Sequence, residues 1–414
     1  MLIVITTFSG ALRKWAEFPN VVNNIALFIS MVIPVYLLFF FKNEEQSVLN
    51  KNLRIALNIF LFFLIALIFH PLNTTFYHGL FGFFIHLSFI GILISYIKNK
   101  KNFDSKKIVR LFFFILGTQL IIATIQYGSP SDSFINRYAD HNQGENNGKE
   151  QKEGIAVVGD AVRVTGTFSY LGGYAALLFF FLLYTFYLAK SKDAKYFYIL
   201  TPIIIYGSLL SGARASVGFT IILIAIFSFI EKKLLLSNIK LALNTVILVS
   251  LLFIFNIAIG DKLGILEQID SALGNFIQRV EENQQESQGR LTGDLYEVFF
   301  REFEHKNFGV GLGSTYQGAN VLFGTSEIIR STPMEGELFR LVIEGGIFFI
   351  FFRWILIAFI FSYLDFPLLL KISFFIIFCI FTIITFNIYN AIYISLGIIC
   401  LNQAYSEPYA KKTI

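Results

Sequence analysis

The chain has 414 residues, of which 55% are hydrophobic and 15% are charged, and its formal net charge is +5. Apolar runs long enough to cross a bilayer, about 20 residues each, recur along its whole length, which excludes a soluble globular enzyme. Phenylalanine occurs 50 times, as suits helices that face lipid. We therefore expect an all-α, polytopic transmembrane helical bundle.

The apolar runs predict about twelve membrane spans with two long polar inserts between them. The predicted spans are 1–10, 21–41, 53–70, 75–97, 108–127, 166–189, 196–211, 213–230, 239–259, 338–362, 366–384 and 386–403. This pattern divides the chain into an N-terminal bundle (1–259, with an external loop at 128–165), a large extracytoplasmic loop (260–337) and C-terminal helices (338–414).

Lysine placement orients these spans. Clusters at Lys98–Lys107, Lys190–Lys195, Lys232–Lys240 and Lys411–Lys412 fall on one face of the predicted topology. Short loops rich in lysine and arginine stay cytoplasmic, so we expect both termini inside and both long inserts outside. Within the second insert, Leu291, Leu295, Phe299 and Phe303 recur every four residues and predict an amphipathic helix. The chain is then expected to be a multi-pass protein of the cytoplasmic membrane.

Arg214 follows Ser211-Gly212-Ala213 between two apolar runs. A guanidinium stays charged in proteins and costs roughly 2.5–3.5 kcal/mol at bilayer depth, so such residues usually mark a function. Its planar fork suits phosphate or pyrophosphate. The simpler interpretation is an arginine that ends a helix and reaches the head groups.

The external insert carries further candidates. Arg290 stands before the predicted amphipathic helix, and Gly309, Gly311 and Gly313 alternate in a loop whose backbone could bind an anion or simply turn tightly. The insert re-enters the membrane through a segment that holds Glu335, Glu337, Arg340 and Glu344. These charges either line a polar cavity or form a local ion pair at a helix N-terminus. Arg163 is a further candidate for substrate binding.

The remaining reactive residue types indicate structural roles. The five histidines show no metal-ligand spacing, so we expect no metal site and interpret them as structural. Cys379 and Cys400 lie inside apolar runs and are expected as free thiols. The sequence lacks a Walker loop, and we expect no cofactor.

Together these features resemble the bacterial O-antigen polymerase/O-antigen ligase family of membrane glycosyltransferases. Ser211–Ala215, Arg290 with the glycine loop, and Glu335-Gly336-Glu337 with Glu344-Gly345-Gly346 match family motifs in order. Gly10–Trp15 is similar to an N-terminal Leu-Arg-Lys-Trp segment in some members. The ligase branch carries a histidine at the re-entry point, where this chain has Thr332–Glu335, and this departure favours the polymerase branch.

The resemblance implies a metal-independent polymerase of polysaccharide biosynthesis (O-antigen, capsule or exopolysaccharide). Its donor is an oligosaccharide repeat unit on a polyprenyl (undecaprenyl) pyrophosphate, and it acts at the extracytoplasmic face, with a chain-length regulator and a flippase as possible pathway partners. Arg214 and Arg290 would stabilise the leaving pyrophosphate, and Glu335 or Glu337 would accept the proton of the attacking hydroxyl. Arg340, Glu344, the loop glycines and Arg163 would bind substrate. Nothing suggests nucleic acid. The alternatives are ligase-type transfer to another acceptor and a lipid-linked oligosaccharide flippase or transporter.

Overall fold

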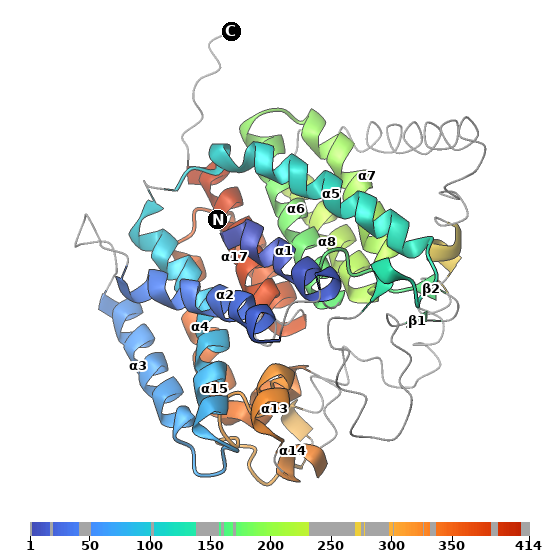
Figure 1. Ribbon diagram of the computed structural model, residues 1–414. Coiled ribbons are helices and arrows are strands. Elements are labelled where there is room, and N and C mark those ends of the chain that lie inside the picture. Colours follow the sequence, from blue (N-terminus) through green and yellow to red (C-terminus); the bar gives the residue numbers. More distant parts are fainter. Residues whose placement is uncertain are drawn as a thin grey trace. The chain divides into compact units, whose positions relative to one another are not determined.

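The structure of the chain is a computed structural model, shown in Figure 1. It describes residues 2–16, 20–40, 51–100, 103–137, 157–158, 161–168, 171–231, 270–274, 277, 298–300, 302–325, 327–331, 337–381 and 388–406. The predicted span 239–259, Arg290, Glu335 and most of the predicted amphipathic helix lie outside these ranges.

Within the described ranges the chain is helical apart from two short strands, β1 (Val157–Val158) and β2 (Ala161–Val162), which pair antiparallel. The longer helices are α1 (Leu2–Trp15), α2 (Asn20–Phe40), α3 (Lys51–Ile68), α4 (Phe76–Lys98), α5 (Val109–Tyr127), α6 (Leu171–Ser191), α7 (Lys195–Leu210), α8 (Arg214–Ile230), α15 (Glu337–Ser362), α16 (Leu368–Phe375) and α17 (Ile388–Ser406). The shorter ones are a 3-10 helix before α5 (Ser105–Ile108), another at Phe134–Asn136, α13 (Gln317–Phe323), α14 (Glu327–Ser331) and a π-helical turn after α16 (Ile376–Phe381).

Helices therefore occupy every predicted span that the structure describes, with ends that differ by a few residues. Among the described residues, five helical segments are long and apolar enough to cross a membrane: 51–68, 76–98, 105–127, 171–191 and 338–362. The same residues contain four shorter apolar helical stretches, in α2, α7, α8 and at 368–380. The helical membrane character is thus supported, and the count of about twelve spans stays a prediction.

One span begins later than predicted. The run at 166–189 suggested a helix from residue 166, but α6 starts at Leu171 and residues 163–168 are not helical. Gly166 has a φ of 57°, a left-handed conformation that favours glycine. Side chains from other helices bond this segment, as described below, and these tertiary bonds replace helical ones.

The chain forms two compact units, and each combines segments that are far apart in sequence. The first contains residues 1–30, 104–282 and 396–414. Its centre is α6, whose residues from Gly173 to Leu188 are almost all buried, and which packs on α7 and α8. Phe186 of α6 stacks on Phe227 of α8 with ring centroids 4.1 Å apart.

The second unit contains residues 31–103 and 283–395. Here α3 packs on α4 and α15, and α13 packs on α4. Phe349 of α15 stacks on Phe60 and Phe63 of α3, with centroids 5.7 and 6.2 Å apart. At one end of this unit Lys100, just after α4, donates to the carbonyl of Tyr363, just after α15. The ends of these two helices therefore meet.

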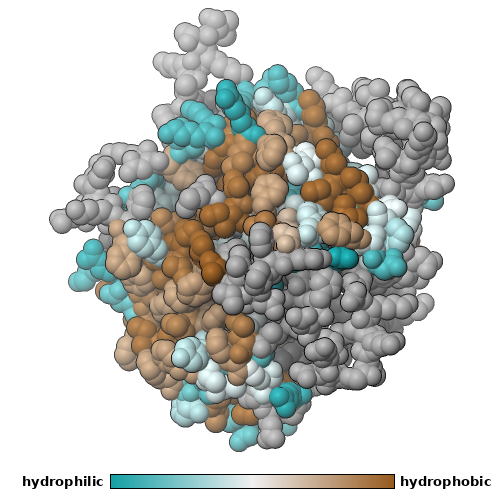
Figure 2. All heavy atoms as spheres, viewed as in Figure 1, coloured by the Kyte–Doolittle hydropathy of each residue, from teal (hydrophilic) through white to brown (hydrophobic). Residues whose placement is uncertain are grey.

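Apolar side chains also cover much of the surface of the described helices. Figure 2 shows hydrophobic residues over much of the visible face. Phe62 of α3, Phe114 of α5 and Phe229 of α8 are each more than half exposed. Exposed rings of this kind on long apolar helices are expected where lipid, rather than water, surrounds the protein.

Candidate functional site

The glycine loop at 309–313 lies against the start of α15. Gly309, Gly311 and Gly313 have φ angles of 73°, 113° and 72°, so all three adopt the left-handed conformation. The amide of Val310 donates to the carbonyl of Ile343 at 2.7 Å, and that of Gly311 to the carbonyl of Glu344 at 3.0 Å. The loop is therefore hydrogen-bonded to the helix by its backbone.

The same loop approaches the start of α4. A Cβ atom on Gly313 would collide with the carbonyl oxygen of His78, and one on Gly82 would collide with the amide of Gly313. Both glycines are required for this close approach of two backbones. Asn73, in the turn between α3 and α4, donates to the carbonyl of Leu312 at 3.2 Å. The loop is thus held between the α3–α4 turn and α15.

The carboxylate of Glu344 joins these elements. It accepts four hydrogen bonds: from His86 Nε2 at 2.8 Å, Gly313 N at 2.9 Å, Thr315 N at 3.0 Å and Thr315 Oγ1 at 2.6 Å. Glu344 and His86 are both fully buried. A buried carboxylate is costly unless it is paired and hydrogen-bonded, and here both oxygens are satisfied. We call this arrangement of Glu344, His86, Gly313 and Thr315 the Glu344 clamp.

A helix break accompanies the clamp. Gly346 interrupts α15 with a φ of 75°, and its neighbour Ile347 donates to the carbonyl of Lys306 at 2.9 Å. Residues from the loop thus take over a backbone bond that a continuous helix would satisfy itself. Two residues of Glu344-Gly345-Gly346 therefore hold this loop in different ways. The carboxylate of Glu344 accepts hydrogen bonds from the loop, and the break at Gly346 allows the backbone near Lys306 to bond to the helix.

Two arginines flank the clamp along α15. Arg353 is buried, and its Nη1 donates to the carbonyl of His86 at 3.0 Å. Its Nη2 is buried with no hydrogen-bond partner among the described residues. Arg340 lies about one turn before Glu344. It is partly exposed, and its Nε has no hydrogen-bond partner in the described part of the chain.

His78 of α4 lies against the glycine loop at Gly313. Its Nε2 lies 3.2 Å from Oδ1 of Asn320 in α13, and its Nδ1 lies 2.9 Å from the hydroxyl of Thr75. His78 and His86 are thus both buried and hydrogen-bonded, in keeping with the structural role expected for the histidines. His70 lies just beyond α3, where burial and the neighbouring His305 lower its pKa. Cys379 and Cys400 are free thiols, as predicted.

A second polar cluster, in the first unit, holds the segment that follows Arg163. Lys14 of α1 donates to Thr165 Oγ1 at 2.9 Å and to the carbonyl of Gly166 at 3.1 Å. Gln126 of α5 exchanges two hydrogen bonds with Gly166, and Gln119 does the same with Thr167. Burial lowers the pKa of Lys14 to about 7. Lys14 belongs to the Leu-Arg-Lys-Trp motif, so that motif positions the Arg163 segment.

The proposed catalytic residues are described only in part. Arg214 is the first residue of α8, after a break at Gly212, whose φ is 61°. Within this break, Ser211 Oγ accepts a hydrogen bond from the amide of Ala213 at 3.2 Å. Glu337 begins α15, and only the backbone of Arg214 and Glu337 is described. Their catalytic roles, and those of Arg290 and Glu335, stay predictions.

Sequence reasoning missed the anchors of both clusters. His86, Thr315 and Lys14 look unremarkable as single residues, because their partners are distant in sequence. Gln119 and Gln126 carried a usable signal: two amides seven residues apart share one face of an apolar helix. Uncharged polar side chains on one face of a span usually bond something buried there.

Comparison with protein-family models, curated proteins and solved structures finds no match for this chain. The proposal below therefore depends on the residues and on their surroundings.

Proposed function

We propose that the chain is a membrane glycosyltransferase that polymerises oligosaccharide repeat units carried on polyprenyl pyrophosphate at the extracytoplasmic face. The observation that carries this proposal is the clamped glycine loop. An external insert that is pinned by Glu344 to the start of an apolar helix is a rigid place for polar chemistry at the membrane surface. The order of motifs around it resembles the O-antigen polymerase branch.

The chemistry is a single displacement at a glycosyl phosphate. The oxygen of a sugar hydroxyl on the acceptor bonds to the anomeric carbon of the donor glycan. The bond from that carbon to phosphate oxygen breaks, and the pyrophosphate leaves with the electron pair. Arg214 and Arg290 stabilise the charge on the leaving group through paired N–H···O contacts. Glu335 or Glu337 takes the hydroxyl proton.

Two described residues, Glu344 and Arg340, add to this proposal. Glu344 is saturated by hydrogen bonds from His86, Gly313 and Thr315, so its role is to position the loop rather than to bind the sugar. Arg340 lies one turn nearer the helix start, and its Nε has no hydrogen-bond partner among the described residues. It suits contact with a hydroxyl or phosphate oxygen of the substrate.

The test uses variants of the full-length protein in a host that lacks its own polymerase, with polymer length read from a carbohydrate ladder. Arg214→Ala and Arg290→Ala should leave only single repeat units at normal expression. Arg214→Lys should restore part of the polymer, because it keeps the charge but not the fork. Lys107→Gln, an exposed change elsewhere, is the matched control. Full-length polymer from well-expressed alanine variants would refute the proposal.

A second candidate is a lipid-linked oligosaccharide flippase or transporter. His86, Glu344 and Arg353 are ionisable, buried and within apolar helices, and such residues also mark transport pathways. The same cells separate the two functions. Loss of a polymerase leaves lipid-linked single units exposed outside the membrane, whereas loss of a flippase leaves them inside. Accessibility of the units to an added glycosidase distinguishes these outcomes.

A further inference from the structure

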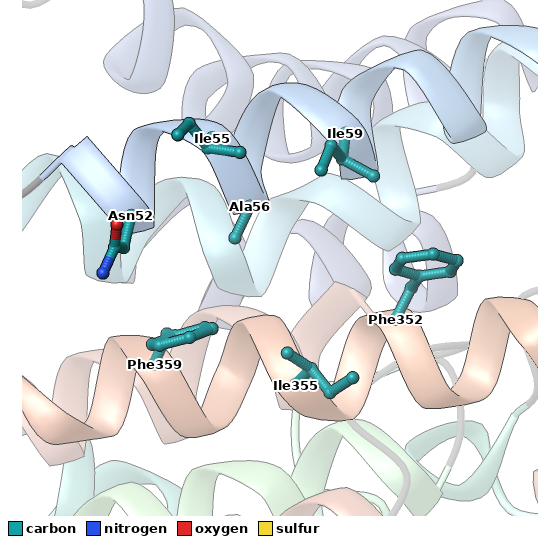
Figure 3. Close-up of a pocket in the computed structure, with 7 residues that line it drawn as sticks. All are labelled: Asn52, Ile55, Ala56, Ile59, Phe352, Ile355 and Phe359. Atoms are coloured by element: carbon teal, nitrogen blue, oxygen red, sulfur yellow. The ribbon is translucent and has the colours of Figure 1, made fainter.

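An apolar groove runs between α3 and α15 of the second unit, at the end away from the glycine loop. It has a volume of about 300 Å³, and its lining residues are Asn52, Ile55, Ala56, Ile59, Phe352, Ile355 and Phe359. Figure 3 shows Asn52 and Phe359 at one end and Ile59 and Phe352 at the other. Seven residues of each helix separate the ends, a length of about 10 Å at 1.5 Å per residue.

The shape of the groove follows from its residues. Ala56 is the smallest lining side chain and leaves a hollow between the larger ones on either side. Five of the lining residues, all isoleucine or phenylalanine, are between 38% and 52% exposed. Asn52 is the one polar lining residue, and it lies at the end of the groove rather than in its floor. An apolar chain is the occupant that this lining suits.

Cations gather at the Asn52–Phe359 end. Lys51 is exposed and directly precedes Asn52. Ser362 lies about one helical turn beyond Phe359. Its carbonyl accepts a hydrogen bond from Lys371 Nζ at 3.2 Å. Lys100 is nearby and pairs with Asp365 at 3.0 Å, so that carboxylate does not offset the other two lysines. No lining residue at either end is charged, so Lys51 and Lys371 are neighbours of the groove and not part of its lining.

The geometry points to a binding site for an anionic membrane phospholipid, with one acyl chain in the groove and its phosphate at Lys51 and Lys371. An apolar slot with cations at one mouth matches the two parts of such a lipid, and a zwitterionic head group would gain less from the lysines. The lysine pattern of the sequence puts this end on the cytoplasmic side, where anionic lipids are abundant. The inference does not depend on the proposed function.

Native mass spectrometry of the purified full-length protein in detergent tests this site, with phosphatidylglycerol and phosphatidylcholine as probes. Wild-type protein should retain phosphatidylglycerol more strongly. Ala56→Phe should weaken this binding roughly tenfold by filling the groove, because apolar contact with the chain is lost. Ala66→Phe is the matched control, since Ala66 is exposed on the same helix and does not line the groove.

A second experiment tests whether the lysines bind the lipid head group, with Lys51→Gln and Lys371→Gln combined in one variant. This pair should lower phosphatidylglycerol binding to the level of phosphatidylcholine, while Lys107→Gln should change nothing. These lysines lie outside the core, so this arm stays informative if Ala56→Phe fails to fold. Equal binding of the two lipids to the wild type overturns the proposal. The proposal is also overturned if Ala56→Phe binds phosphatidylglycerol as strongly as Ala66→Phe does. It is overturned as well if the wild-type protein is a dimer and Ala56→Phe dissociates it.

Discussion

Replacing Glu344 tests whether the clamp holds the glycine loop. Glu344→Ala removes the acceptor of four hydrogen bonds and leaves the amides of Gly313 and Thr315 facing an apolar gap. Each buried donor left unsatisfied costs about 1–3 kcal/mol. The costs do not add fully, because neighbouring groups relax together. We therefore expect a loss of about 3–5 kcal/mol, the range for breaking a buried pair by removing one partner.

Glu344→Gln separates charge from hydrogen bonding. The carboxamide keeps one oxygen, which can still accept from one pair of donors, but its NH2 group must face the other pair. We expect about half the loss of the alanine variant, roughly 2 kcal/mol. Glu302→Gln is the matched control, because Glu302 is an exposed carboxylate just before the same loop. A surface change of this kind should stay within about 0.5 kcal/mol.

Two measurements check this reasoning on the detergent-solubilised protein. Thermal unfolding should rank the variants as Glu302→Gln, Glu344→Gln and Glu344→Ala in order of increasing loss. Hydrogen exchange should show the amides of Gly313 and Thr315 protected in the wild type and exposed in Glu344→Ala. If Glu344→Ala unfolds at the temperature of Glu302→Gln and both amides stay protected, the clamp does not position the loop.

Three further predictions concern single positions. Gly313→Ala should destabilise the protein far more than Gly324→Ala in a thermal unfolding assay. Both glycines have positive φ, but a Cβ atom on Gly313 would meet the carbonyl of His78, whereas one on Gly324 would meet open space. Equal losses of stability would mean that backbone strain alone matters. Arg353→Met should leave the melting temperature unchanged or raise it. Arg353 is a buried cation without a carboxylate partner among the described residues, so removing it from water costs free energy on folding. A clear drop in melting temperature would reveal an acidic partner. Lys14 has a pKa of about 7 when folded and an ordinary value of 10.5, so the unfolded chain binds more protons between these values, and the free energy of unfolding should rise with pH from about 7 to 10.5. Lys14→Met should remove that rise in a pH series of melting temperatures, and an unchanged slope would refute the assignment.

The positions of the helices could be predicted from the sequence. Apolar runs of span length require helices, because backbone groups in lipid must bond within their own segment. Each described helix from α1 to α8 and from α15 to α17 falls on such a run. The break at Ser211–Ala213, which brings Arg214 to the start of α8, was also visible as a cluster of small residues between two runs.

The partners of the polar residues were decided by the tertiary structure. Glu344 was visible as a charge at the start of a span, but its bonds to His86 and Thr315 link residues that are 258 and 29 positions away. Lys14 and Thr165 are separated by 151 positions. Hydropathy along a chain identifies the segments that must be buried or meet lipid, since that depends on local composition. Which buried polar groups satisfy one another depends on how the helices pack, and no local pattern encodes that.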